Sequence, residues 1–77
     1  MTKILLVEDN VDLAIGLELN LKKEGYKVLK VSTGEEALKH AIHDNPDLII
    51  LDIMLPGISG LDVCRELRQK SIAIPII

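Results

Sequence analysis

Three short apolar runs that lack any alternation of polar and apolar residues restrict the fold of this chain more than any other feature. They lie at residues 3–8, 48–52 and 72–77. An unbroken apolar run is typical of a strand that is covered on both faces, as in the middle of a parallel sheet. The run at residues 26–31 is interrupted by two lysines and therefore predicts a strand at the sheet edge.

The segments between these runs carry apolar residues at helical spacing. Helices are predicted over residues 10–24, in the interval after residue 33 and over residues 61–69. Their predicted N-caps are Asn10, Thr33 and Ser59. The first predicted helix has its apolar face at Leu13, Ala14, Leu17 and Leu21. The resulting order is βαβαβαβ, and right-handed crossovers in such a chain give a parallel sheet with helices on both faces.

Composition excludes several classes of function. The chain is 48% hydrophobic and 27% charged, so it can form a hydrophobic core. Its 77 residues are enough for one domain at most. We expect neither a membrane span nor a secretory leader, because no apolar stretch approaches the ~20 residues of a span. The net charge of −3 and the single aromatic residue argue against nucleic-acid binding by this segment. The only cysteine, Cys64, cannot form an internal disulfide, which fits a cytoplasmic protein.

Acidic side chains follow two of the predicted strands at the point where each strand ends. Glu8 and Asp9 follow the first strand, and Asp52 ends the third. In open α/β sheets, ligands bind outside the carboxyl ends of the strands. If the first and third strands are neighbours, these ends lie about 5 Å apart and three carboxylates share one small cleft.

The residue types in this cleft favour one kind of chemistry. No glycine-rich phosphate loop follows the first strand, and clustered carboxylates repel both one another and a bare phosphate. A hard cation such as Mg²⁺ or Mn²⁺ would relieve the repulsion, admit a phosphoryl group and leave one carboxylate free to attack it. The alternative is structural, because Asp9 after a strand is also a common cap or loop residue, and Asp52 alone could be a polar boundary.

Three segments together carry a resemblance to a known family. They are residues 5–10 (LLVEDN), residues 47–57 (DLIILDIMLPG) and the pair Ser59-Gly60. In this combination the chain resembles the receiver domain of bacterial two-component response regulators. The Met54–Gly57 segment is most similar to the branch that carries a winged-helix DNA-binding output domain. The resemblance implies a flavodoxin-like α/β fold with strand order 2-1-3-4, in which Gly60 lets the third helix begin close to the site.

The resemblance also implies a role for each acidic residue. Asp52 would accept a phosphoryl group from the phosphohistidine of a sensor histidine kinase. Glu8, Asp9, Asp52 and the backbone carbonyl of Met54 would hold Mg²⁺ or Mn²⁺. The chain would be a phosphoacceptor and not a turnover enzyme. Residues 1–77 would form the N-terminal two-thirds of one receiver domain, without the fifth strand, the last two helices, and the lysine and hydroxyl side chains that complete the family's site.

Two other functions stay open. A receiver of this extent could be an interaction module that is never phosphorylated. A Mg²⁺-dependent phosphatase with an aspartyl-phosphate intermediate is the second, although it usually has a D-x-D pattern where this chain has Glu8-Asp9-Asn10. We also expect self-association, or completion by further polypeptide, because the strand at 72–77 has an unpaired edge and apolar surface lies bare beside the first helix.

Overall fold

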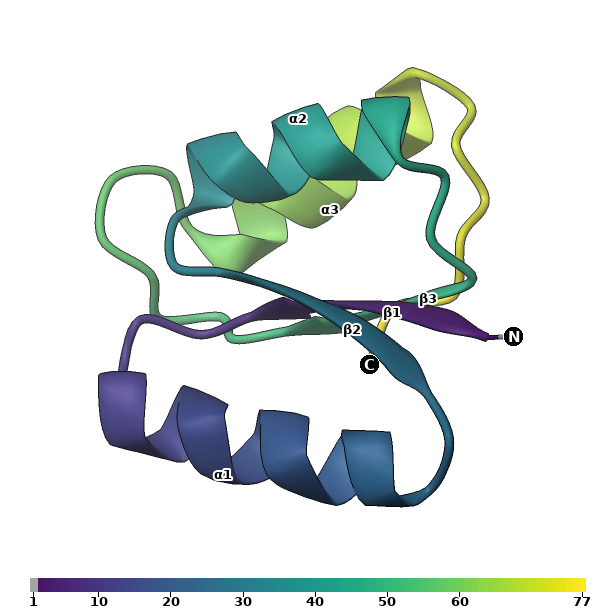
Figure 1. Ribbon diagram of the computed structural model, residues 1–77. Coiled ribbons are helices and arrows are strands. Elements are labelled where there is room, and N and C mark those ends of the chain that lie inside the picture. The colour runs from purple at the N-terminus through teal and green to yellow at the C-terminus, as the bar shows by residue number, and fades with distance from the viewer. Residues whose placement is uncertain (1) are drawn as a thin grey trace.

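The computed structural model describes residues 2–77 and consists of a parallel sheet with helices on both faces (Figure 1). The strands are β1 (Lys3–Val7), β2 (Lys27–Val31) and β3 (Leu48–Leu51), and the helices are α1 (Val11–Lys23), α2 (Gly34–His43) and α3 (Gly60–Gln69). The sheet order is β2-β1-β3, with both strand pairs parallel. Helix α1 covers one face, while α2 and α3 lie together on the other. The flavodoxin-like α/β architecture is as predicted.

The central strand β1 carries the core. Its residues Ile4 to Val7 are each no more than 2% exposed, as expected for a strand that is covered on both faces. Leu5 and Val7 pack with Ile49 of β3 in the cluster beneath α2 and α3. The register pairs Val7 with Leu51 and with Val31, so the carboxyl ends of the three strands lie side by side.

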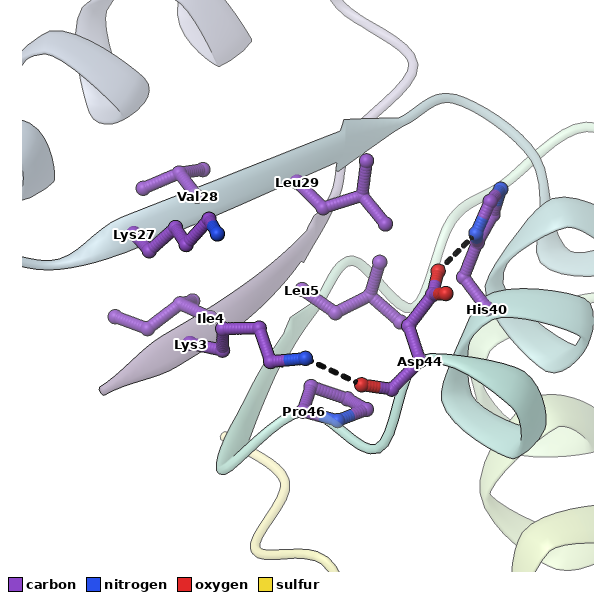
Figure 2. Close-up of a pocket in the computed structure, with 9 residues that line it drawn as sticks. All are labelled: Lys3, Ile4, Leu5, Lys27, Val28, Leu29, His40, Asp44 and Pro46. Carbon is purple, nitrogen blue, oxygen red and sulfur yellow. Dashed lines mark hydrogen bonds and ion pairs between the residues drawn. The ribbon is translucent and has the colours of Figure 1, made fainter. Parts of the chain in front are cut away.

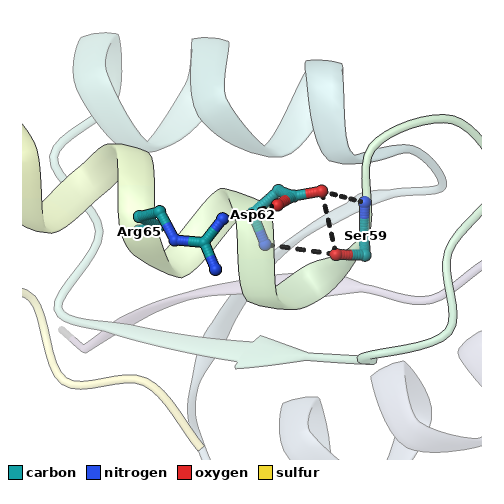
Figure 3. Close-up of polar contacts among 3 residues, drawn as sticks. All are labelled: Ser59, Asp62 and Arg65. Carbon is teal, nitrogen blue, oxygen red and sulfur yellow. Dashed lines mark hydrogen bonds and ion pairs between the residues drawn. The ribbon is translucent and has the colours of Figure 1, made fainter.

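All three predicted N-caps are confirmed. The side-chain oxygens of Asn10 and Thr33 accept hydrogen bonds from the backbone N–H groups of Leu13 and Glu36, at 3.0 and 3.2 Å. Ser59 and Asp62 form a reciprocal capping box at the start of α3 (Figure 3). In that box the Asp62 N–H donates to Ser59 Oγ, and Asp62 Oδ2 accepts from the Ser59 N–H and hydroxyl. Each helix start is thereby fixed directly after a loop.

The prediction of a regular fourth strand at residues 72–77 is wrong in extent. Residues 75–77 pair with β3 through one parallel bridge, between Ile49 and Ile76, and three backbone hydrogen bonds, whereas residues 72–74 form no bridge. Pro75 has no N–H to give to a ladder. The Arg68 guanidinium of α3 also donates to the carbonyls of Ile72 and Ile74, at 2.6 and 3.1 Å. The described sheet therefore has the order 2-1-3, with residues 72–77 placed where a fourth strand would lie.

The predicted apolar face of α1 is only partly buried. Ala14 is 3% exposed, whereas Leu13 remains 50% exposed. The helix packs on β1 and β2, and the β3 residues Leu48 and Ile50 stay partly exposed. Helical spacing puts Leu13 on the apolar face of α1, but spacing alone does not show that α1 leaves β3 uncovered. Within residues 2–77, no helix has the length and apolar character needed to cross a membrane.

Candidate functional site

The structure brings together the three carboxylates that the sequence placed at strand ends. Glu8 and Asp9 follow β1 directly, and Asp52 follows β3. The strands are held in register at this point, because the Asp52 N–H donates to the Val7 carbonyl at 3.1 Å. One oxygen from each of the three carboxylates lies within 4.8 Å of the other two. The predicted acidic cleft at the carboxyl end of the sheet is therefore present.

Backbone groups orient two of these carboxylates. Asp52 Oδ1 accepts a hydrogen bond from the Met54 N–H at 3.0 Å, and Glu8 Oε2 accepts one from the Asn10 N–H at 3.2 Å. Glu8 and Asp52 are partly buried, and Asp9 is exposed. Each ionised carboxylate has about four acceptor positions, so these bonds leave most of them available. The carboxylates are thus held in place without being fully occupied.

The charge of the cleft is not balanced by protein cations. Within residues 2–77, no lysine or arginine forms an ion pair with Glu8, Asp9 or Asp52. Three negative groups at this separation repel one another. Hard oxygen donors in such a cluster are the ligands that Mg²⁺ prefers. The donor set therefore fits a divalent cation.

The loop between β3 and α3 approaches the site closely. The Gly60 N–H donates to the Ile53 carbonyl at 2.9 Å. A Cβ on Gly60 would overlap the Asp52 carbonyl oxygen and lie 2.8 Å from the Ile53 Cα. Gly57 has a φ of +76°, and a Cβ there would meet the Glu35 carboxylate at 2.9 Å. Only glycine fits these two positions without a shift of the backbone or of Glu35.

Two further polar residues lie at the same edge of the sheet and were not predicted as site residues from the sequence. Ser32 and Glu36 line a pocket beside Glu8 and Asp9. Glu36 Oε1 accepts hydrogen bonds from Ser32 Oγ and Thr33 Oγ1 at 3.3 and 3.1 Å. The missed signal is that β2 also ends at this edge, so polar residues after every parallel strand belong to the same candidate site. The Met54 carbonyl remains a ligand predicted from the resemblance alone.

Known proteins are similar to this chain in sequence. Residues 4–77 match the family model of the response regulator receiver domain. The chain is 48% identical over 75 residues to the alkaline phosphatase synthesis transcriptional regulatory protein PhoP of Bacillus subtilis, covering 97% of this chain and 31% of that protein. It is 44% identical over 77 residues to the transcriptional regulatory protein AfsQ1 of Streptomyces coelicolor, covering 100% of this chain and 34% of that protein.

Solved structures of response regulators are also similar to this chain. The response regulator protein TrrA of Thermotoga maritima, in complex with Mg²⁺-BeF, superposes with a TM-score of 0.93 at 45% identity, covering 99% of this chain and 66% of that chain. The same protein has been solved with the histidine kinase ThkA. The chain belongs to the receiver domain family of two-component response regulators. It spans about a third of the length of the two curated relatives, at 31% and 34%.

Proposed function

We propose that this chain is the phosphoacceptor portion of a receiver domain, and that Asp52 takes a phosphoryl group from the phosphohistidine of a sensor histidine kinase. The observation that carries the proposal is the convergence of Glu8, Asp9 and Asp52 within 4.8 Å at the carboxyl ends of β1 and β3. The T. maritima relative TrrA, solved with the kinase ThkA, supports a kinase as the partner class. The proposed compartment is the cytoplasm, because the unpaired Cys64 fits a reducing environment.

The residues present fit a divalent cation. Glu8, Asp9, Asp52 and the Met54 carbonyl would hold Mg²⁺, or Mn²⁺ in its place. When bound, the cation supplies positive charge that lets a phosphoryl group approach an acidic cleft. The T. maritima relative solved with Mg²⁺-BeF supports this assignment.

The chain's own residues position the nucleophile. The Met54 N–H holds Asp52 Oδ1, which fixes the orientation of the carboxylate. A carboxylate oxygen of Asp52 forms a bond to phosphorus, the bond between phosphorus and the kinase imidazole nitrogen breaks, and the electron pair stays on that nitrogen. The product is an acyl phosphate on Asp52. Because Asp52 itself is consumed, the chain acts as an acceptor and not as a turnover enzyme.

Phosphotransfer tests this proposal. We would join residues 1–77 to the C-terminal third of the TrrA receiver, because that part supplies the cationic partner that the family's acceptor site uses, and add ³²P-labelled ThkA. We expect Mg²⁺-dependent label on the chain, loss of label in Asp52→Asn, and retention in Asp47→Asn. Asp47 is a matched control because its carboxylate is engaged by the Lys3 N–H at the other edge of the sheet. For residues 1–77 alone we expect slow labelling, since no lysine or arginine pairs with the cleft.

An interaction module that is never phosphorylated is the second candidate. The partly exposed Leu48 and Ile50, together with the half-exposed Leu13, favour it because they offer apolar surface to a partner. If the chain joined to the TrrA C-terminal third is folded but takes no label from ThkA, that result would support the interaction module. Steady release of phosphate from p-nitrophenyl phosphate would instead support a phosphatase.

A further inference from the structure

A second pocket opens at the opposite edge of the sheet from the three carboxylates. It lies at the amino ends of β1 and β2, beneath the C-terminal end of α2 (Figure 2). Its volume is about 300 Å³, at the lower limit of the range for small-molecule sites. The residues that matter for the argument are Lys3, Leu5, Lys27, Leu29, His40 and Asp44. None of them belongs to the proposed phosphoacceptor site.

The floor of the pocket is apolar. Leu5 and Leu29 are paired in register on neighbouring strands, so their side chains lie on the same face of the sheet. Leu5 is 1% exposed, whereas Leu29 is 40% exposed. Val31, two residues further along β2 on the same face, is 6% exposed beneath the core cluster. The pocket therefore leaves one leucine of this face open to a hydrocarbon group.

The rim of the pocket is cationic. Lys3 and Lys27 are also paired in register, which places two like charges side by side. The Lys3 ammonium donates to the backbone carbonyl of Asp44 at 2.7 Å. In the described part of the chain, neither lysine forms an ion pair. Two ammonium groups in this arrangement favour an anion between them.

The acidic groups nearby are engaged by other donors. The Asp44 carboxylate pairs with His40 Nδ1 at 2.5 Å (Figure 2). The Asp47 carboxylate accepts a hydrogen bond from the Lys3 backbone N–H at 2.8 Å. Both carboxylates thus accept hydrogen bonds of their own, and within residues 2–77 neither forms an ion pair with Lys3 or Lys27. Among the described residues, Lys3 and Lys27 are therefore left without an ion-pair partner at the rim.

We propose that this pocket binds a small amphipathic anion, namely a carboxylate carried on a saturated hydrocarbon chain. The carboxylate lies between the ammonium groups of Lys3 and Lys27, and the hydrocarbon chain contacts Leu5 and Leu29. The charge selects an anion, and the uncovered leucine selects an apolar body. The site lies at the other edge of the sheet from Asp52, so the proposal is independent of the phosphoacceptor role.

Equilibrium dialysis of the 77-residue chain with ¹⁴C-octanoate tests the proposal. We expect saturable binding at one site per chain, and at least about tenfold weaker binding in Lys27→Gln, because a charge-assisted contact is lost. Lys27→Arg keeps the charge and should keep the binding. Lys30→Gln is the matched control: it removes the same charge from the same strand, but Lys30 points to the other face and pairs with Glu18. Neutral octan-1-ol should bind at least about tenfold more weakly than octanoate.

Four results would overturn the proposal. The first three are the absence of saturable octanoate binding, equal binding by wild type and Lys27→Gln, and equal binding of octanoate and octan-1-ol. The fourth is an equal loss in Lys27→Gln and Lys30→Gln, which would show attraction by net charge alone. Far-UV circular dichroism of each variant shows that the helices are retained, and dialysis gives a valid result even where the chain associates.

Discussion

Gly60 begins α3 directly against the backbone of Asp52. A Cβ at Gly60 would overlap the Asp52 carbonyl oxygen and approach the Ile53 Cα to 2.8 Å, a distance that real Cβ atoms do not reach. The start of a helix and the proposed acceptor are thus in direct backbone contact. Any side chain at Gly60 must displace the backbone of Asp52 and Ile53.

We therefore predict that Gly60→Ala lowers the free energy of unfolding by about 1–3 kcal/mol, as overpacking of a tight site does. The affinity for Mg²⁺ should fall as well. Gly16→Ala is the matched control, since a Cβ at Gly16 meets nothing within 4 Å. In the interior of α1 this change should raise the free energy of unfolding by about 0.4–1 kcal/mol. Urea denaturation measures the free energy of unfolding of both variants. Equal effects of the two substitutions would contradict the close approach of Gly60 to Asp52.

Mg²⁺ binding tests the donor set. Asp9→Asn should weaken Mg²⁺ at least about tenfold, because loss of even a group behind a metal ligand typically costs that much. Asp12→Asn removes an equal charge from the exposed first turn of α1 and should change the affinity little. Isothermal titration calorimetry distinguishes the two. Equal affinities of wild type and Asp9→Asn would exclude Asp9 as a ligand.

The acid sensitivity of the fold should depend on Glu18. A hydrogen bond from Lys22 is the largest cause that lowers the pKa of Glu18 below its ordinary value of 4.5, and Lys30 adds to it. A lowered folded-state pKa stabilises the fold above the ordinary value, and the stabilisation is lost as pH falls through the lower value. We predict that Glu18→Gln is less stable than wild type at pH 7 and loses less stability on acidification. Urea titrations between pH 7 and pH 3 test this, with exposed Glu66→Gln as the control. Parallel pH profiles for wild type and Glu18→Gln would argue against the Lys22 and Lys30 contacts.

Self-association should follow from the surface between α1 and β3. Leu13 of α1 is 50% exposed, Leu48 and Ile50 of β3 are partly exposed, and Ile77 is 76% exposed. We predict that the 77-residue chain at micromolar concentration scatters light as a species larger than 8.5 kDa. Leu13→Gln should reduce the association. Leu19→Gln, which changes a leucine of α1 that is 60% exposed and lies away from the buried Ala14 face, should not. A cooperative thermal transition from an 8.5 kDa species would contradict this prediction.

Local patterns were enough to predict the features of the fold that depend on neighbouring residues. The unbroken apolar run of β1 predicted a strand covered on both faces, and Asn10, Thr33 and Ser59 are caps because their side chains meet the next turn. The acidic cleft followed because parallel strands end at one edge.

Features that depend on tertiary partners could not be predicted in this way. Arg68 of α3 donates hydrogen bonds to the carbonyls of Ile72 and Ile74. These contacts depend on how α3 packs, so no local sequence pattern predicts that the two residues lack regular strand pairing. Leu13 lies at helical spacing from Leu17, yet its burial depends on whether anything covers β3. The pairing of Lys3 with Lys27 depends on strand register, which residue spacing alone does not give.

The location of the phosphoryl group tests the central claim most directly. The chain joined to the TrrA C-terminal third would be treated with phosphoramidate and Mg²⁺ and reduced with borohydride, which converts an aspartyl phosphate to homoserine. Peptide mass spectrometry would then identify the converted residue. We predict homoserine at position 52 alone, and none in Asp52→Asn or without Mg²⁺. Homoserine at position 9 in place of 52, or no conversion in a folded chain, would contradict the account.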